Sequence, residues 1–185
     1  MASSKSSFLQ ASILLVVVLP FLLIVPSFAR LNVKVNFDEI NILCSKIKNP
    51  PFCEAVLKST PGVDTADFPG LIKITIDLAR SNATNTQNLI KSLVPKATEP
   101  RLKASYTSCS DHYDRALGDF GDGEQALNAN DPNRLSSYTS AAWNETIYCE
   151  NELQGLAPDP SLPKGCQDLQ SFCAIILVVA NLLPR

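Results

Sequence analysis

Residues 44–53 read CSKIKNPPFC, and this stretch separates two short helical patterns. Before it, apolar side chains recur at helical spacing from Phe37 to Ile47. Asn49 and the two prolines after it end that helix, because proline lacks the backbone N–H that a continuing helix needs. A second short helix is predicted over about 51–58, with proline in the favoured first turn. The sequence therefore predicts a short helical hairpin.

Four longer helical patterns follow the hairpin, at about 65–93, 100–128, 132–153 and 166–183. We expect a kink or short break at Gly121–Gly123, because each glycine costs ~1 kcal/mol of helix stability relative to alanine. Residues 155–165 are rich in proline and glycine and are predicted to form a loop. Long helices with short connections favour an all-α, up-down-up-down four-helix bundle, to which the hairpin is an N-terminal extension.

The N-terminal segment has the pattern of a secretory signal. Lys5 precedes an apolar run over 8–25. The small residues Ser27 and Ala29 follow it and suit the −3 and −1 positions of a signal-peptidase cleavage site. Cleavage after Ala29 is predicted, which leaves 30–185 as one mature domain. An uncleaved membrane anchor is the alternative, but Pro20 interrupts the run and no basic cluster follows it. We expect a secreted protein with no membrane attachment after cleavage.

Charge and cysteine content narrow the function further. The full chain has a net charge of −2, which becomes −3 once Lys5 is removed with the signal, and it has no basic block. Nucleic-acid binding is therefore not expected. All six cysteines lie in the mature chain, where disulfides are expected, although 15 pairings are open. Two sequons allow N-glycosylation, at Asn82 and Asn144.

No catalytic set is recognisable in the sequence. The only histidine, His112, lies in a polar stretch with Ser110, Asp111 and Asp114 and is predicted to occupy a solvated helix face. A catalytic base would need a positioned nucleophile nearby. Nucleophile-elbow, paired-histidine zinc and phosphate-loop motifs do not occur. We therefore expect no enzyme activity, no metal site and no cofactor.

The ordered motifs resemble the plant invertase/pectin methylesterase inhibitor family over about 36–184. They are the 44–53 stretch, CSDHY at 109–113, a fourth cysteine at 149 followed by Glu150, and the ending CAIILVVANLLP at 173–184. The resemblance implies disulfides Cys44–Cys53 and Cys109–Cys149. It also implies a secreted inhibitor of the apoplast and cell wall, which covers the substrate cleft of a target enzyme in a 1:1 complex.

The resemblance places the target-binding contacts on two bundle helices. Carried over residue by residue, the contacts fall at Asp111, Arg115, Gly118, Asp131, Ser136, Tyr148 and Asn151. Arg115 and Gly118 stand where the family pattern has carboxylates, Tyr148 replaces a threonine, and Asn151 replaces an acid. A reversed charge at Arg115 is expected to weaken binding to a partner adapted to carboxylates.

The branch of the family decides the expected target. The stretch YTSAA at 138–142 and the ending at 181–184 resemble the pectin methylesterase branch, and only Asp131-Pro132 matches the invertase branch. We favour a pectin methylesterase as partner, with acid invertase as the alternative. A non-inhibitory structural or interaction protein and a carrier of apolar ligands are the other hypotheses, and the sequence lacks the eight-cysteine pattern typical of such carriers.

The last two cysteines have no partner implied by the resemblance. Seven residues on one helix would separate Cys166 and Cys173 by ~10.5 Å, too far for a bridge. Either Cys166 precedes the helix, or one or both thiols are free. A dimer through Cys166 is a further hypothesis.

Overall fold

The computed structural model describes residues 34–184, so the predicted signal peptide, 1–29, lies outside the described residues. These residues form α2 (Phe37–Cys44), α3 (Pro50–Ser59), the 3₁₀ turn η2 (Val63–Thr65), α4 (Phe68–Leu93), α5 (Pro100–Asn128), α6 (Pro132–Glu152) and α7 (Ser161–Ala180). No strand occurs within this range. The all-α prediction is confirmed.

Polar caps and prolines determine where most helices begin. The side chains of Asn36, Asn49, Asp67, Glu99 and Asp131 each accept a hydrogen bond from a backbone N–H in the first turn of the next helix. Proline occupies the first or second position of α3, α4, α5 and α6, where its missing N–H leaves no helical bond unmade. Local sequence therefore sets the starts of most helices that form the bundle.

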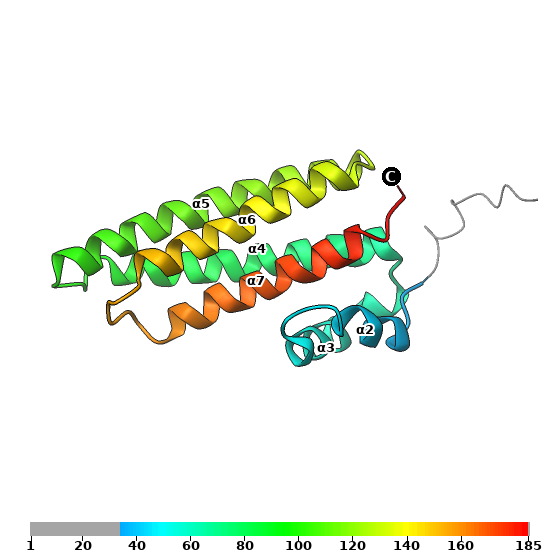
Figure 1. Cartoon of the computed structure of the whole chain (residues 1–185), viewed down its shortest axis with the longest axis horizontal. Helices are drawn as coiled ribbons and strands as arrows, with labels where there is room; N and C mark the ends of the chain where they lie inside the picture. Colours follow the sequence, from blue (N-terminus) through cyan, green and yellow to red (C-terminus); the bar gives the residue numbers. More distant parts are fainter. Residues whose placement is uncertain (1–33, 185) are drawn as a thin grey trace, which may run out of the picture. The chain divides into compact units, whose positions relative to one another are not determined.

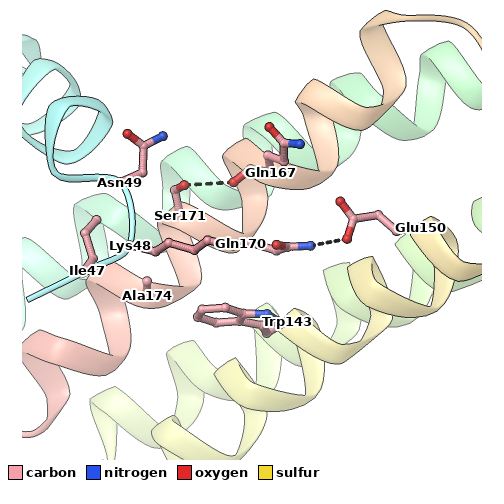
Figure 2. Close-up of a pocket in the computed structure, with 9 residues that line it drawn as sticks. All are labelled: Ile47, Lys48, Asn49, Trp143, Glu150, Gln167, Gln170, Ser171 and Ala174. Carbon is pink, nitrogen blue, oxygen red and sulfur yellow. Dashed lines mark hydrogen bonds between the residues drawn. The ribbon is translucent and has the colours of Figure 1, made fainter.

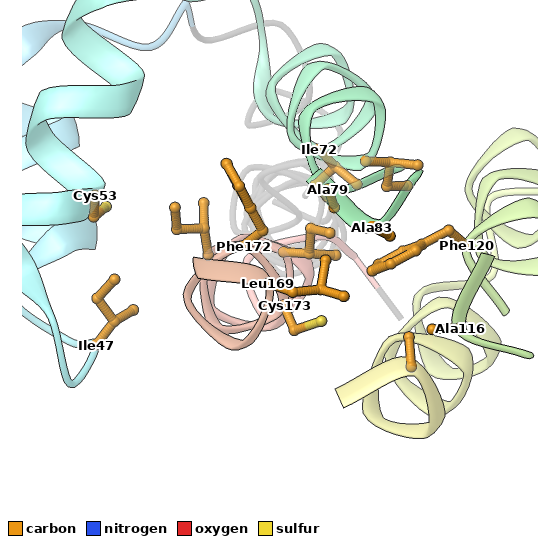
Figure 3. Close-up of a cluster of buried hydrophobic side chains, with 14 of the residues drawn as sticks. Ile47, Cys53, Ile72, Ala79, Ala83, Ala116, Phe120, Leu169, Phe172 and Cys173 are labelled. Carbon is orange, nitrogen blue, oxygen red and sulfur yellow. The ribbon is translucent and has the colours of Figure 1, made fainter. Parts of the chain in front are cut away.

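The four long helices pack as a closed bundle. Each contacts the next along the chain, and α7 returns to pack against α4, while α2 and α3 lie against α7 (Figure 1). The predicted up-down-up-down arrangement is confirmed. Figure 3 shows side chains from several helices meeting in one core, including Ile72, Phe120, Leu169 and Phe172. On the hairpin side, the ring of Phe52 meets the edge of the Phe172 ring, with centroids 5.2 Å apart.

In α4 and α5, two predictions were wrong because packing or capping outweighed local propensity. α5 continues unbroken through Gly121–Gly123. Gly123 is buried, and a β-carbon there would lie 3.7 Å from Leu135 and 3.8 Å from Tyr138, so the glycine suits the approach of α6. α4 begins at Phe68 rather than near 65, because η2 and the Asp67 cap precede it.

The predicted loop at 155–165 was too long. α7 begins at Ser161, so Cys166 lies inside the helix. Gly165 is a point of close approach to α4, since a β-carbon there would lie only 2.6 Å from the Thr86 hydroxyl. Gly165 is required for the close packing of α7 against α4 and does not form a turn, so interpreting it as part of a loop made the predicted loop too long.

Both predicted disulfides are present, Cys44–Cys53 and Cys109–Cys149. Cys166 and Cys173 are free and buried on α7. Burial raises the pKa of the Cys166 thiol to about 11, and the Tyr113 hydroxyl donates to its sulfur at 3.4 Å. A protonated, buried thiol is a poor nucleophile, which opposes the hypothesis of a dimer through Cys166.

Candidate functional site

The predicted α5 contacts form one exposed row. Asp111, Arg115 and Gly118 follow one another at helical spacing, and all three are exposed. The side chain of Arg115 is 53% exposed. A β-carbon added at Gly118 would have no heavy atom within 4 Å, so the backbone of α5 is open to a partner there. The row is therefore available for contact.

The C-terminal part of α6 extends this row. Tyr148 is 49% exposed, Asn151 is exposed, and the disulfide Cys109–Cys149 holds this end of α6 level with the middle of α5, with Cα atoms 4.6 Å apart. The Tyr148 ring lies 5.5 Å from the His112 ring, measured between centroids. Asp111, Arg115, Tyr148 and Asn151 are thus exposed residues of the same helix pair, and we call the surface that carries them the α5–α6 face.

Asp131 and Ser136 lie at the other end of α6. Asp131 caps that helix, since its carboxylate accepts from the Arg134 N–H at 3.0 Å, and Ser136 is only partly exposed. Twelve residues of helix separate Ser136 from Tyr148, a rise of ~18 Å. The seven predicted contacts therefore do not gather at one point but extend along the helix pair.

His112 was predicted to lie on a solvated face, and this was wrong. Its side chain is 12% exposed, and Nδ1 lies 2.6 Å from the Glu145 carboxylate on α6. Glu145 also accepts from Arg115 Nε at 2.9 Å and is itself 15% exposed. We call these three residues the seam cluster. His112 follows Cys109 by three residues and Glu145 precedes Cys149 by four, so the disulfide register could have paired them.

The charge of Glu145 in the seam cluster also contributes to a shift in the pKa of a neighbouring carboxyl, that of Asp119. The pKa of Asp119 is raised, first by burial and then by the negative charges of Glu145 and Asp122, while Arg115 opposes the shift. The face thus combines a basic group with several acids at close range. Beyond His112, a groove of about 640 Å³ runs between the helices, lined by Arg101, Ser105, Ser108, Tyr148, Asn151 and Glu152.

The described part of the chain contains neither a candidate metal site nor a candidate membrane-spanning helix. No group of three or more His, Cys, Asp and Glu side chains is placed to hold a metal ion among residues 34–184. None of the helices in the same range has the length and apolar character needed to cross a bilayer.

The two sequons differ in accessibility. Asn144 is exposed on α6, one turn before Tyr148. Asn82 is only partly exposed on α4, and its Oδ1 atom is buried without a hydrogen-bond partner. Use of either sequon stays a prediction.

Comparison with known proteins supplies the family. Residues 38–179 match the family described as plant invertase/pectin methylesterase inhibitor. A pectinesterase inhibitor from Actinidia deliciosa is 35% identical over 179 residues, covering 96% of this chain and 97% of the relative. Pectinesterase inhibitor 2 from Arabidopsis thaliana is 37% identical over 145 residues, covering 78% and 84%.

A solved structure agrees in fold as well as in sequence. The crystal structure of mutant form A of a pectin methylesterase inhibitor from Arabidopsis superposes with a TM-score of 0.73 at 29% identity, covering 80% of this chain and 98% of that one. Relatives described as invertase inhibitors are more distant. The chain therefore belongs to the plant invertase/pectin methylesterase inhibitor family.

Proposed function

We propose that this protein is a secreted inhibitor of a plant pectin methylesterase and blocks the enzyme's substrate cleft with its α5–α6 face. The observation that carries the proposal is the similarity, over 96% and 78% of the chain, to two relatives named as pectinesterase inhibitors. The exposure of Asp111, Arg115, Tyr148 and Asn151 supports it, because these residues occupy positions at which the family resemblance places contacts with the target.

The rigidity of the face favours this mode of action. The disulfide Cys109–Cys149 fixes α5 against α6, and the Ser105 hydroxyl donates to the Glu152 carbonyl at 2.8 Å. Glu145 holds Arg115 and His112 in place before any partner arrives. Pre-ordered side chains lose little conformational entropy on binding, so more of the contact energy appears as affinity.

The seam cluster also changes the expected effect of the Arg115 charge on target binding. Its charge replaces a carboxylate of the family pattern, which by itself would weaken binding to an enzyme adapted to acids. Glu145 compensates that charge at 2.9 Å, so the partner meets a neutralised pair rather than a bare guanidinium. We therefore expect inhibition to be retained despite the substitution.

Parallel titrations test the proposal. Mature protein is added to a plant pectin methylesterase and to a plant acid invertase, and the residual activity of each is measured. Esterase activity should fall to a plateau at one inhibitor per enzyme, with invertase unaffected. Inhibition of invertase alone, or of neither enzyme, would reject the proposal.

A pair of matched variants tests the face. Tyr148→Ala, which removes a 49% exposed aromatic ring, should weaken esterase inhibition by at least about tenfold, as expected for an aromatic anchor. Ile42→Ala removes a 57% exposed side chain on α2 and should leave inhibition unchanged. Equal effects of the two variants would exclude the α5–α6 face. A glycan at Asn144 would cover this face, so the proposal also requires that asparagine to be unmodified.

A further inference from the structure

A second cavity lies on the other side of α6, away from α5. It has a volume of about 530 Å³ and is lined by the α2–α3 loop, α6 and α7, with Lys48, Asn49, Trp143, Glu150, Gln167 and Gln170 among its walls (Figure 2). This volume falls within the range of small-molecule sites, ~300–1,000 Å³. Residues about a hundred positions apart in the chain thus form one pocket with both polar and apolar walls, which we call the indole pocket.

The walls of the indole pocket are held in place. The disulfide Cys44–Cys53 closes the loop that carries Lys48 and Asn49, and Asn49 also caps α3 by accepting from the Phe52 N–H at 3.3 Å. On α6, Trp143 and Glu150 lie two turns apart and so face the same way. The Gln170 carboxamide donates to the Glu150 carboxylate at 2.9 Å and links α7 to α6. The pocket is therefore preformed.

The lining combines one aromatic platform with many hydrogen-bonding groups. Trp143 is the only tryptophan of the sequence, and it is partly exposed at the pocket. Figure 2 shows its indole extending from α6 toward α7, near Gln170 and Ala174. Among the described residues, the Lys48 ammonium and the Gln167 carboxamide have no protein hydrogen-bond partner, so both can bind a guest.

This combination matches the chemistry of a sugar ring. A pyranose presents a C–H face that stacks on an aromatic ring, and its hydroxyls both donate and accept hydrogen bonds. Carboxamides offer two donors and an acceptor, a carboxylate accepts, and an ammonium donates. Lys48 and Glu150 carry opposite charges, so the pocket has no net charge that would select a phosphate or another anion. We propose that the indole pocket binds a neutral oligosaccharide, with one ring stacked on Trp143.

The proposal does not depend on esterase inhibition. Trp143 and Glu150 face α7 and the hairpin loop, whereas Glu145 and Tyr148 face α5. The same helix therefore serves two separate sites. A variant in the indole pocket should leave the inhibition of pectin methylesterase unchanged, and Tyr148→Ala should leave sugar binding unchanged.

Tryptophan fluorescence tests the proposal directly, because a single indole reports on the pocket. Mature protein is titrated with cellotriose, maltotriose and trigalacturonate under selective excitation of tryptophan, and binding is confirmed by calorimetry. At least one neutral trisaccharide should shift the emission and saturate. Gln167→Ala, which alters an exposed side chain, should weaken that binding roughly three- to tenfold through a lost hydrogen bond.

Gln125→Ala is the matched control, since Gln125 is an exposed glutamine on α5 that lies outside the pocket. It should bind the trisaccharide like the unmodified protein. The proposal is overturned if neither neutral sugar gives an emission change or heat, if trigalacturonate alone binds, or if the Gln167 and Gln125 variants bind equally well.

Discussion

Two helical hairpins in this protein are closed by a disulfide, and they are built differently. The α2–α3 hairpin has helices of 8 and 10 residues, and its disulfide joins cysteines 9 positions apart. The α5–α6 hairpin has helices of 29 and 21 residues, and its disulfide spans 40 positions. Within the described residues, only the longer hairpin has side-chain hydrogen bonds across its interface, including those of the seam cluster.

The difference shows how each hairpin obtains its order. The short helices expose large apolar side chains, Phe37 at 58% and Ile42 at 57%, and so bury too little surface to be stable alone. They depend on the cross-link and on docking against α7, where Phe52 meets Phe172. The long helices α5 and α6 bury an extended interface, and the disulfide Cys109–Cys149 fixes the register of one helix against the other. The α5–α6 face proposed above as the binding surface thus lies on the hairpin with the more extensive helix–helix interface.

The largest expected effect comes from removing the long-range disulfide. Cys109→Ala/Cys149→Ala should lower the free energy of unfolding by ~4 kcal/mol, because a loop of 40 residues loses much of its constraint in the unfolded chain. Cys44→Ala/Cys53→Ala should lose only ~2.5 kcal/mol by the same relation. Denaturant unfolding of both oxidised variants measures the two losses.

Hydrogen exchange then separates local from global unfolding. In Cys44→Ala/Cys53→Ala, the amides of α2 and α3 should exchange faster while those of α5 and α6 keep their protection. In Cys109→Ala/Cys149→Ala, protection should fall throughout the bundle. Equal losses in all helices of both variants would contradict the contrast between the hairpins.

The seam cluster should have the next largest effect. Glu145→Gln removes the charge that His112 and Arg115 share, and it should destabilise the protein by about 1–2 kcal/mol because His112 and Glu145 are 12% and 15% exposed. Most of this loss belongs to His112, since the Arg115 side chain is 53% exposed and its pair is screened by water. Thermal unfolding measures the change.

The short hairpin offers the matched control for this variant. Glu54 pairs with Lys58 at 2.9 Å on α3, but the two side chains are 40% and 36% exposed. Glu54→Gln should therefore change stability by less than about 0.5 kcal/mol. If Glu54→Gln cost as much as Glu145→Gln, burial of the seam cluster would not be what stabilises it.

Sequence patterns predicted what local chemistry decides, and missed what tertiary contacts decide. The observed starts of α5 and α6 agree with the predicted ranges, because a cap and a following proline set each of them locally, as at Asp131 and Pro132. Gly123 and Gly165 were interpreted as helix breakers, but each lies where another helix approaches. His112 seemed solvated because its neighbours in sequence are polar, while its partner Glu145 lies 33 positions away.

The same limits apply to the candidate sites. The α5 row at Asp111, Arg115 and Gly118 could be predicted, because helical spacing alone puts these residues on one face. The indole pocket could not, since the α2–α3 loop, α6 and α7 meet there only after the hairpin docks on the bundle. Pairing across helices could have been predicted only where a disulfide fixed the register, as for the seam cluster, and the polar neighbours of His112 hid it.

The smallest effect is expected at Asp119, and its sign follows from the direction of the pKa shift. Burial and the charges of Glu145 and Asp122 raise the folded-state pKa of Asp119 above its ordinary value of 3.8. Above the folded-state pKa, the carboxylate is charged in both states and the folded state bears the penalty. As pH falls through that pKa, the folded state takes up the proton first and gains stability relative to the unfolded chain.

Asp119→Asn removes this penalty, so the variant should unfold at a slightly higher temperature than the unmodified protein at neutral pH. The difference should shrink on acidification and vanish below pH 3.8, where both states of the unmodified protein bind the proton. Asp64→Asn, at an exposed aspartate in η2 near the short hairpin, is the control and should leave the unfolding temperature at neutral pH unchanged. A variant at Asp119 that is less stable than the unmodified protein at neutral pH would contradict this prediction and would mean that the carboxylate stabilises the α5–α6 interface.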